Sequence, residues 1–487
     1  MQWNKLIRTL QVIKQGGEGD PEVTHITYDS RRVRSGCVFV AIPGFNVDGD
    51  RFIDAAVTKG AAAVVSQKEQ AGRKLPWIQV ENAREALGIL SKQIHGVNLD
   101  ETACVAVTGT NGKTTTVYLF DHLFENYYGR EKTWMFGTVK YLMGQTVEQA
   151  PRTTPESSDL FLRIGAAAEK PRALAMEVSS HALALYRVAG FTYDIAVWTN
   201  LTQDHLDFHN TMEEYYQSKK VLFTKYLKKK AVAVINIDDR WGRRLGGELV
   251  DTNILSYGRS DDADVRIVES TCTLEQTKVT FSYKNEKTAV SCPLAGEFNV
   301  YNIASFFSGA MALGIPRERI EQGLRTMQVV PGRMETVPGP EGTVAIVDYA
   351  HTPDALEKVL AAVQPLTSGR LFCVFGCGGD RDRGKRPLMA EAVARYCDEA
   401  IVTDDNPRSE NPKQIIKDIL EGLPLDFSFQ VVQDRRDAIR TVLKRMRPGD
   451  SVVIAGKGHE TYQEVNGVRH HFDDREVVLA ITNELQG

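Results

Sequence analysis

The chain has 487 residues, of which 42% are hydrophobic and 25% are charged, as is ordinary for a globular protein. This length exceeds one ordinary core and suggests about three domains. The formal charge of −4 argues against a general nucleic-acid or membrane-surface binder, and the longest block of like charge, Lys228 to Lys230, is typical of a solvated helix end.

Cysteine usage and the N-terminus indicate a cytoplasmic protein. Seven cysteines are scattered along the chain without a C-x-x-C motif, which fits reduced thiols better than a disulfide framework. The opening MQWNKLIRTLQVIKQ spaces polar residues among apolar ones and therefore lacks the apolar core of a signal peptide. No stretch approaches the roughly 20 apolar residues of a membrane span. We expect no membrane span and no nucleic-acid partner.

Two segments of the chain differ in the elements that they predict. In the first, strand-like pieces separated by polar turns lie at 38–42, 62–65 and 77–80, before a helix-like segment from Arg84. From Glu101 onward, strands alternate with helices, which indicates a mostly parallel sheet covered on both faces. These strands are predicted at 103–108, 173–178, 195–199 and 231–235. Later pieces are an antiparallel insertion at 265–283, a helix at 299–313, and a linker region at 331–332 and 337–342.

The stretch VAVTGTNGKTTTVYLF at 105–120 has the character of a buried strand, a tight turn and a helix. The turn consists of Gly109, Thr110, Asn111 and Gly112. Its glycines let backbone N–H groups face an anion near a helix N-terminus. Lys113 would add a positive charge for the outer phosphates of a nucleotide, and Thr114 or Thr115 a hydroxyl ligand for Mg²⁺. The usual P-loop spacing has glycine in place of Val107; the alternative, a glycine turn with a solvated lysine, is disfavoured by the flanking strand and helix.

Two further motifs place charged or metal-binding side chains after strands. In AMEVSSH, Glu177 follows an apolar run, and a buried carboxylate is costly unless it is paired or binds a metal. Mg²⁺ ligation is favoured over a structural carboxylate hydrogen-bonded to a helix end. TNLTQDHLDFH carries His205 and His209, and the next predicted helix carries Lys219 and Lys220. This composition permits a metal site, but the spacing matches no zinc signature, so that solvated loop histidines remain the alternative.

The last third of the chain has a second series of strands and helices. Its apolar runs each end in a polar loop, in TVAIVDYAHTPD, LFCVFGCGGDRD, AIVTDDNPR and SVVIAGKGHE. Ligands of open α/β sheets lie beyond the carboxyl ends of the strands, so these four loops predict one shared site.

Charged residues in and near these loops allow two interpretations each. Arg333 in PGRME and Asp348 in DYAHTPD suit contacts to a nucleotide held between two domains, or they form a surface ion pair. The cationic cluster on the glycine turn of GGDRDRGKRP suits an anionic substrate, or it is a solvated helix start. This cluster consists of Arg381, Arg383, Lys385 and Arg386.

Ten motifs occur in the order of the Mur ligase family, which the chain resembles over nearly its whole length. They are TGTNGKTTT, EVSSHAL, NLTQDHLDFH, the lysine of EEYYQSK, GEFNVYN, PGRME, DYAHTPD, GDRDRGKRP, DNPR and GKGHE. The N-terminal stretches TYDSRRV and VAIPGFNVDGD belong to the same resemblance. Within the family, the chain is similar to the members that add the third amino acid of the peptide.

The resemblance implies an α/β fold of three domains and an ATP-dependent ligase. A smaller N-terminal α/β domain (1–98) would bind UDP-MurNAc, a central P-loop-type ATPase domain with a mostly parallel sheet (99–331) would bind ATP, and a C-terminal Rossmann-like domain (332–487) would bind the amino acid. The D-Glu side-chain carboxylate of UDP-MurNAc-L-Ala-D-Glu would attack the γ-phosphate of ATP, and the amine of meso-2,6-diaminopimelate would capture the acyl phosphate, with Mg²⁺ stabilising the negative charge. A monomer in the bacterial cytoplasm is expected.

The resemblance also assigns roles to residues of the nucleotide side. Those implied in catalysis are Lys113, Glu177, His205 and Lys219. The first Mg²⁺ would be bound by Thr114, Thr115 and Glu177. His205 would help bind a second Mg²⁺, and Lys219, 14 residues later (219 − 205), matches the family's carbamylated lysine, whose modification turns an amine into a metal-binding carbamate. The nucleotide contacts outside the turn would be Asn302 at the adenine, Arg333 and Asp348.

The two substrate sites are implied in the same way. For the UDP-sugar dipeptide, the matching residues are Ser30, Thr153, Thr154, Ser179 and Arg187. Leu185 departs from the glutamine that some relatives carry two residues before that arginine. For diaminopimelate, the matching residues are Arg381, Asp405, Asn406, Pro407, Arg408, Gly456 and Glu460. Arg408 can bind the second carboxylate, which lysine lacks, through two charge-assisted bonds, while Glu460 would face the distal ammonium.

Three alternatives compete with this interpretation. A lysine-adding ligase of the same family would lack the arginine of DNPR. A folylpolyglutamate synthetase shares the GTNGK turn but is disfavoured by DNPR and by the long N-terminal domain. A non-catalytic nucleotide-dependent scaffold is disfavoured by the presence of Lys113, Glu177, His205 and Lys219 together.

Overall fold

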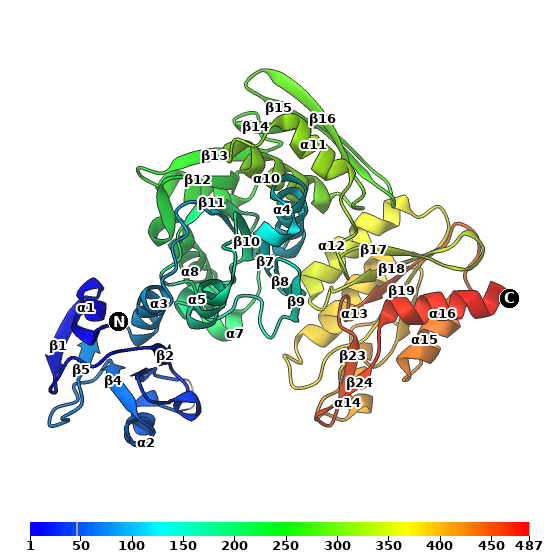
Figure 1. Ribbon diagram of the computed structural model, residues 1–487. Coiled ribbons are helices and arrows are strands. Elements are labelled where there is room, and N and C mark those ends of the chain that lie inside the picture. The colour runs from blue at the N-terminus through cyan, green and yellow to red at the C-terminus, as the bar shows by residue number, and fades with distance from the viewer. Residues whose placement is uncertain (45–46, 487) are drawn as a thin grey trace.

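The chain folds into three α/β units, described by a computed structural model for residues 1–44 and 47–486. Figure 1 shows the central unit, cyan to green, between the blue N-terminal unit and the yellow-to-red C-terminal unit. The units contain sheets of five, eleven and six strands, respectively. The prediction of an α/β fold with three domains is therefore confirmed, while the domain limits 1–98, 99–331 and 332–487 stay predictions.

The N-terminal sheet has the strand order β1-β5-β4-β3-β2, in which only the edge strand β1 runs antiparallel to its neighbour. Its strands are β1 (Val12–Gly16), β2 (His25–Thr27), β3 (Cys37–Val40), β4 (Ala61–Ser66) and β5 (Trp77–Val80). The helices of this unit are α1 (Trp3–Leu6), α2 (Ile53–Thr58) and α3 (Ala83–Ile94). The predicted strands and helix of this segment are present, with ends shifted by one or two residues.

The central sheet has the order β16-β15-β14-β13-β12-β11-β6-β10-β7-β8-β9, and its run from β14 to β7 is parallel throughout. The parallel strands are β6 (Ala103–Thr108), β7 (Thr133–Phe136), β10 (Ala173–Glu177), β11 (Tyr193–Trp198), β12 (Leu227–Asn236), β13 (Asn253–Gly258) and β14 (Val265–Cys272). Antiparallel strands extend both edges: β8 (Lys140–Met143), β9 (Thr146–Gln149), β15 (Thr277–Tyr283) and β16 (Glu286–Cys292). The mostly parallel sheet and the antiparallel insertion were both predicted.

Helices cover both faces of this sheet. The sheet thereby divides the apolar core into two clusters, one on each face. They are α4 (Lys113–Tyr128), α5 (Ser157–Ala166), α6 (Ser180–Ala184), α7 (Leu206–His209), α8 (Met212–Lys225), α9 (Arg240–Glu248), α10 (Phe298–Ala312) and α11 (Arg317–Arg325). The ring of Phe120 on α4 is fully buried and lies edge-on to Phe306 of α10, with 5.2 Å between ring centroids. A Cβ at Gly309 would press on the Phe120 ring, so that the glycine lets α10 pack closely against α4.

The C-terminal sheet has the order β17-β18-β22-β19-β20-β21, and only β17 is antiparallel. Its strands are β17 (Glu335–Pro338), β18 (Val344–Asp348), β19 (Leu371–Phe375), β20 (Glu399–Val402), β21 (Phe429–Val431) and β22 (Ser451–Ala455), and a separate hairpin consists of β23 (Tyr462–Val465) and β24 (Val468–His471). The helices are α12 (Pro353–Val363), α13 (Lys385–Tyr396), α14 (Pro412–Leu420), α15 (Arg435–Leu443) and α16 (Asp474–Gln486). None of the helices in the described residues is long and apolar enough to cross a membrane.

Two expectations about local structure were wrong. The block Lys228 to Lys230 lies in β12 and not at a helix end, and the Lys228 ammonium is 2.9 Å from the Asp194 carboxylate. The loop at 337–342 is not a linker, because it completes β17 and turns the chain into β18. The block at 228–230 is decided by the pairing of β12 with the distant strand β11, which the local sequence does not show, whereas 337–342 is the turn of a local hairpin.

Truncation of Phe120 tests the packing of α4 against α10. Because its ring is fully buried, we expect Phe120→Ala to lower the local stability of the central unit by about 3–5 kcal/mol. Hydrogen exchange of the β6 amides measures this loss. Phe429→Ala, at a ring that is 39% exposed on the sheet edge, is the control and should change the stability of its own unit by less than about 1 kcal/mol. Equal protection of β6 in wild type and Phe120→Ala would contradict the packing argument.

Candidate active site

The predicted phosphate turn lies at the carboxyl end of β6, in the middle of the central sheet. Gly112 has a φ of 86° and precedes α4, while Gly109 has a φ of 146°. A Cβ would overlap the Thr199 hydroxyl at Gly109 and the Asn302 side-chain oxygen at Gly112. Both positions therefore require glycine, for conformation and for space. Val107 lies within β6 and pairs with neighbouring strands, which is why the turn forms without the glycine of the usual spacing.

Two lysine side chains converge on this turn. Lys113 donates to the carbonyls of Gly109 and Thr110, at 3.0 and 2.8 Å. Lys219 on α8 donates to the same Gly109 carbonyl at 2.9 Å, and its ammonium lies 4.7 Å from the centroid of the Tyr215 ring. Burial lowers the pKa of Lys113, and burial together with the neighbouring Lys113 lowers the pKa of Lys219 well below its usual value.

The next residue, Lys220, lies outside this site. Its ammonium is 2.8 Å from the Glu248 carboxylate. Successive residues of a helix point about 100° apart, so only one of the two lysines that the sequence left undecided faces the phosphate turn. That lysine is Lys219, which is 1% exposed.

Glu177 ends β10 and is fully buried beside the turn. Its carboxylate accepts hydrogen bonds from the Thr138 backbone N–H at 2.8 Å, from the Thr138 hydroxyl at 3.1 Å and from the Thr114 hydroxyl at 3.1 Å. A Cβ at Gly137 would crowd the carboxylate. The buried carboxylate is thus held by neighbouring donors, with Thr114 of the first turn of α4 among them.

The oxygen atoms around Glu177 fit a hard cation such as Mg²⁺. Glu177 and the hydroxyl groups of Thr114 and Thr115 line one cavity. In the described parts of the chain, no three His, Cys, Asp or Glu side chains are grouped to hold a metal by themselves. Mg²⁺ commonly uses one or two carboxylates together with water and substrate phosphates, so a single carboxylate next to a phosphate turn suits it.

His205 follows β11 and lines the same cavity as Glu177 and Lys219. Its backbone is left-handed, with a φ of 54°, and its Nε2 lies 3.3 Å from the Asp204 carboxylate. The His181 ring, on α6, lies edge-on to it with 4.8 Å between centroids. Sequence reasoning missed His181, because only the fold brings the SSH motif to the HLDFH motif. His209 is buried and stacks on Tyr215.

Arg333 and Asp348 come from the C-terminal unit and reach the same cavity. Arg333 donates to the Thr114 hydroxyl at 3.2 Å and lies over the Tyr349 ring. Asp348 accepts from the backbone N–H groups of Met334 and Ala350, both at 2.7 Å, and burial raises its pKa. The geometry favours the first of the two interpretations, a site between two domains, over a surface ion pair.

The nucleotide-side cavity has a volume of about 570 Å³. The predicted residues that line it are Thr110, Asn111, Gly112, Lys113, Thr114, Thr115, Glu177, His205, Lys219, Asn302, Arg333 and Asp348. Asp354 of α12 bridges the two units, since its carboxylate accepts from the Asn111 amide at 3.1 Å and from the Thr202 hydroxyl at 3.0 Å. The predicted set is therefore brought together in space by two units.

The residues predicted for the UDP-sugar dipeptide are divided between two units. Thr153, Thr154 and Ser179 lie beside Glu177: the Thr154 hydroxyl donates to the Glu177 carbonyl at 2.8 Å, and the Ser179 backbone N–H donates to Thr154 at 3.1 Å. The Arg187 guanidinium lies 3.1 Å from Glu156. Ser30 lies in the N-terminal unit, in the short helix Ser30–Arg32.

A second cavity of about 1190 Å³ lies beyond the carboxyl ends of the C-terminal strands. Six of the residues predicted to bind diaminopimelate line it: Arg381, Asp405, Asn406, Arg408, Gly456 and Glu460. The seventh, Pro407, instead packs its carbonyl against Gly379. Both cavities are lined by Asp204, His205, Tyr349, His351 and Thr352, so they meet at this shared wall.

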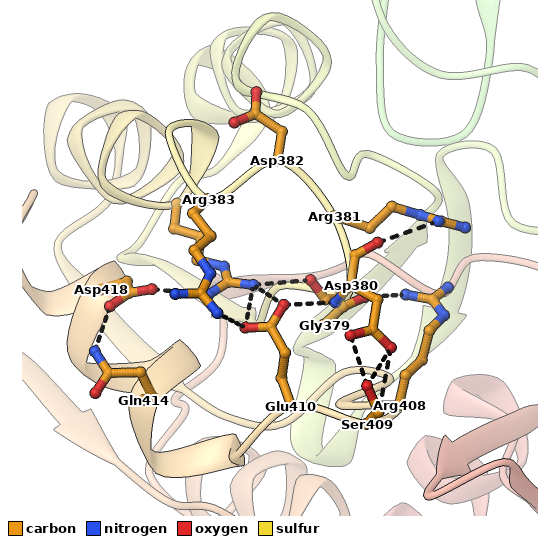
Figure 2. A network of polar contacts seen from close by, with 12 residues as sticks. Gly379, Asp380, Arg381, Asp382, Arg383, Arg408, Ser409, Glu410, Gln414 and Asp418 are labelled. Carbon is orange, nitrogen blue, oxygen red and sulfur yellow. Dashed lines mark hydrogen bonds and ion pairs between the residues drawn. The ribbon is translucent and has the colours of Figure 1, made fainter. Parts of the chain in front are cut away.

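The predicted cationic cluster splits into two parts. Arg386 is fully buried between Glu410 and Asp418, at 3.0 and 2.7 Å, and Arg383 faces Glu410 at 3.3 Å. Arg381 and Lys385 line the second cavity. Figure 2 shows that Glu410, just after Arg408, accepts from the Asp380 backbone N–H of the loop of Arg381 and faces Arg383; Glu410 also accepts from Arg386.

Arg408 has a left-handed backbone, with a φ of 50°, and is fixed at both ends. Its backbone N–H donates to the Glu464 carbonyl of the β23–β24 hairpin at 3.0 Å, and its guanidinium donates to the Gly379 carbonyl at 2.8 Å (Figure 2). On the opposite side, the Asn406 amide donates to the Glu460 carboxylate at 2.8 Å. The site thus holds a planar cation and an acidic group, which together suit a ligand end that carries both charges.

Comparison with known proteins agrees with this geometry along the whole chain. The family patterns that match are the Mur ligase middle domain at residues 107–308, the glutamate ligase domain of Mur ligases at 332–458, and the Mur ligase family catalytic domain at 22–95. A protein of Geobacter metallireducens, named UDP-N-acetylmuramoyl-L-alanyl-D-glutamate--2,6-diaminopimelate ligase, is 40% identical over 100% of this chain and 99% of its own length. A protein of Bacillus velezensis with the same name is 41% identical over 94% of each chain.

Solved structures give the same result. One described as UDP-N-acetylmuramoyl-L-alanyl-D-glutamate--2,6-diaminopimelate ligase is 33% identical and has a TM-score of 0.73 over 100% of this chain and 99% of that one. A MurF ligase of Thermotoga maritima in complex with ADP shares the fold at 22% identity, with a TM-score of 0.63 over 95% and 97% of the two chains. With three matching family domains and full-length relatives at about 40% identity, the chain belongs to the Mur ligase family.

Proposed function

We propose that the protein is an ATP-dependent ligase that joins meso-2,6-diaminopimelate to the D-Glu side-chain carboxylate of UDP-MurNAc-L-Ala-D-Glu, in the synthesis of peptidoglycan precursors. The observation that carries the proposal is the shared wall of the two cavities, at Asp204, His205 and Tyr349. One cavity has the phosphate turn and Glu177, and the other has Arg408 and Glu460. The names of the full-length relatives support the same reaction.

A carboxylate is a poor acyl donor until one of its oxygens becomes a leaving group, which explains the need for ATP. In the first step, a D-Glu carboxylate oxygen bonds to the γ-phosphorus and the bond from that phosphorus to the β-phosphate oxygen breaks, releasing ADP. In the second step, the amine nitrogen of diaminopimelate bonds to the acyl carbon, the bond from carbon to the phosphate oxygen breaks, and the amine loses a proton. Both steps move negative charge past the phosphate turn.

Side chains of this chain would stabilise that charge. Lys113 lies at the turn, and Arg333 reaches it from the C-terminal unit through Thr114. Glu177, Thr114 and Thr115 would hold one Mg²⁺, and His205 would help to hold another. Mg²⁺ supplies screening of the phosphate charge and polarises the phosphoryl oxygens when it is bound. The enclosed position of Lys113 and Lys219 keeps these interactions out of bulk water, where they would be weaker.

Lys219 would act after modification by CO₂. Burial and the neighbouring Lys113 lower its pKa, which favours the neutral amine, and a neutral nitrogen can bond to the carbon of CO₂, lose a proton and become a carbamate. The modification places an anion at the phosphate turn, where the unmodified side chain has an amine. An anion there suits metal ligation, as the resemblance to the family implied.

The amino-acid cavity favours diaminopimelate over L-lysine, the second candidate substrate. L-lysine ends in an ammonium group alone and would leave the Arg408 guanidinium without a carboxylate partner. Binding of L-lysine would therefore lack the charge-assisted bonds that a second carboxylate can accept from Arg408. A lysine-adding ligase would have no use for Arg408 in the position that Figure 2 shows.

Phosphate release tests the proposed function. The purified protein is incubated with ATP, Mg²⁺ and UDP-MurNAc-L-Ala-D-Glu, and either meso-diaminopimelate or L-lysine is added. We expect turnover with diaminopimelate and none without an amino acid, because the acyl phosphate needs an amine. Turnover with L-lysine instead would overturn the assignment of Arg408, and ATP hydrolysis without the other substrates would indicate a nucleotide-dependent switch.

Removal of the Lys219 side chain tests the carbamate. We expect Lys219→Ala to lower kcat by at least about 10²-fold, and added bicarbonate to leave it inactive, since no amine remains to react. The matched control is Lys220→Ala, because the neighbouring lysine pairs with Glu248 outside the site. Normal turnover of Lys219→Ala would refute the role of Lys219.

Removal of the Arg408 side chain tests the carboxylate clamp. Loss of one partner of a buried ion pair costs about 2–5 kcal/mol, and because Arg408 is half-buried we expect the lower end of this range, a rise in the KM of diaminopimelate of roughly 30-fold in Arg408→Ala. The KM of ATP should change less than about threefold. Arg383→Ala is the control, because Arg383 is 65% exposed and faces Glu410. Equal increases of both KM values in Arg408→Ala would show that Arg408 is not a substrate clamp.

A further inference from the structure

Lys457 is a buried cation at the amino-acid cavity to which the proposed reaction gives no role. Its side chain is 0% exposed, directly after β22 and beside the β23–β24 hairpin. A buried ammonium is costly unless it is paired and hydrogen-bonded. Its Nζ donates to the Asn406 side-chain oxygen at 3.2 Å, and it lies 3.5 Å from the Glu460 carboxylate and 3.9 Å from the Asp405 carboxylate.

All three of these partners line the cavity, whereas Lys457 itself is not among its described lining residues. Lys457 can therefore affect a ligand only through Asp405, Asn406 and Glu460. Removing one partner of such a buried group leaves the remaining carboxylates uncompensated and lowers stability. A loss of stability alone therefore cannot show what Lys457 does for the ligand, and the role of Lys457 has to be read from its contacts.

The contacts of Asn406 show what Lys457 orients. The Asn406 side-chain oxygen accepts from Lys457 and from the Glu464 backbone N–H at 2.9 Å. With its oxygen held by two donors, the amide must turn its nitrogen toward Glu460, to which it donates at 2.8 Å. Lys457 thus fixes the direction of an amide that in turn aims a carboxylate into the cavity.

Among the four charged residues Asp405, Glu460, Arg408 and Lys457, the charges balance only when Lys457 is counted. Asp405 and Glu460 contribute two negative charges, and Arg408 and Lys457 contribute two positive charges. The distal end of diaminopimelate carries one ammonium and one carboxylate, and is neutral as a whole. Without Lys457 the four-residue set would have a net negative charge, which would suit a lone ammonium such as that of L-lysine.

We propose that Lys457 is a positioning residue that sets amino-acid specificity, by neutralising one of the two carboxylates and aiming the Asn406 amide at Glu460. The inference rests on the proposed function. Its consequence is that discrimination against L-lysine depends on two cations, one that would touch the substrate carboxylate and one that lies behind the acidic pair.

The experiment replaces Lys457 with methionine, which has a similar length and no charge. We expect Lys457→Met to raise the KM of diaminopimelate about tenfold or more, with the KM of ATP within about twofold of wild type. The ratio of kcat/KM for diaminopimelate to that for L-lysine should fall by about tenfold or more, since the pocket now favours an ammonium alone. Lys457→Gln, which keeps a donor for Asn406 but has no charge, should lower the same ratio. If the methionine variant does not fold, the comparison is made with Lys457→Gln.

The matched control is Lys228→Met. Lys228 is also a largely buried lysine, paired with Asp194 and donating to the carbonyls of Leu99 and Thr102, in the central unit away from the amino-acid cavity. Lys228→Met should lower the stability of the protein without changing the ratio of kcat/KM for diaminopimelate to that for L-lysine. A change of the same size in both variants would overturn the inference.

A pH profile adds a readout that a merely structural role would leave unchanged. Burial and Asp405 raise the pKa of Glu460, whereas Lys457 and the Asn406 amide lower it; Glu460 in turn raises the pKa of the Tyr349 and Tyr462 hydroxyl groups, and Arg408 lines the same cavity. Glu460 must be ionised to bind an ammonium. Removal of Lys457 raises this pKa further, so the acidic limb of kcat/KM for diaminopimelate should move to higher pH in Lys457→Met.

The outcomes separate the two claims. An unchanged substrate ratio together with an unshifted acidic limb in both Lys457 variants would overturn the specificity role. A failure of the proposed function shows instead in the unmodified protein, as absent turnover with diaminopimelate or a preference for L-lysine in the same assay.

Discussion

Two lysine side chains share one buried acceptor at the phosphate turn, and the chemistry of the site depends on this constraint. Lys113 and Lys219 both donate to the Gly109 carbonyl, at 3.0 and 2.9 Å, and burial lowers both pKa values. Two ammonium groups in one water-poor site repel each other. The pair is stable when one lysine is neutral or when anions approach. A phosphate at Lys113 and a carbamate on Lys219 would both relieve the repulsion, and the proposed reaction uses both.

The amino-acid cavity, at the opposite end of the site, must also compensate its buried charges, and it does so with side chains of both signs. There the Lys457 ammonium lies near the carboxylates of Asp405 and Glu460, and Arg408 lines the same cavity, so that the neutral end of a zwitterion is the best match. The two ends belong to different sheets, and they meet because both sheets present the carboxyl ends of their parallel strands to one gap. Asp354, which accepts from Asn111 and Thr202 across that gap, joins them.

The sequence predicted those parts of the structure that depend on local pattern. The phosphate turn follows from two glycines between an apolar strand and a helix, and the alternation of strands and helices predicted the parallel sheets. Side-chain partners at long range could not be predicted. Nothing local distinguishes Lys219 from Lys220, or marks His181 as a neighbour of His205, because only the crossing of separate elements buries one lysine and brings two rings to 4.8 Å. The same holds for Lys228, whose strand is decided by pairing with β11.

The claim that a neutral Lys219 amine becomes a carbamate is tested most directly by ¹³C NMR. The protein is equilibrated with ¹³C-labelled bicarbonate, and the spectrum is compared with those of Lys219→Ala and Lys220→Ala. We expect a carbamate resonance in wild type and in Lys220→Ala that is lost in Lys219→Ala. Identical spectra for wild type and Lys219→Ala would contradict carbamate formation on Lys219. The repulsion between Lys219 and Lys113 would then have to be relieved in some other manner.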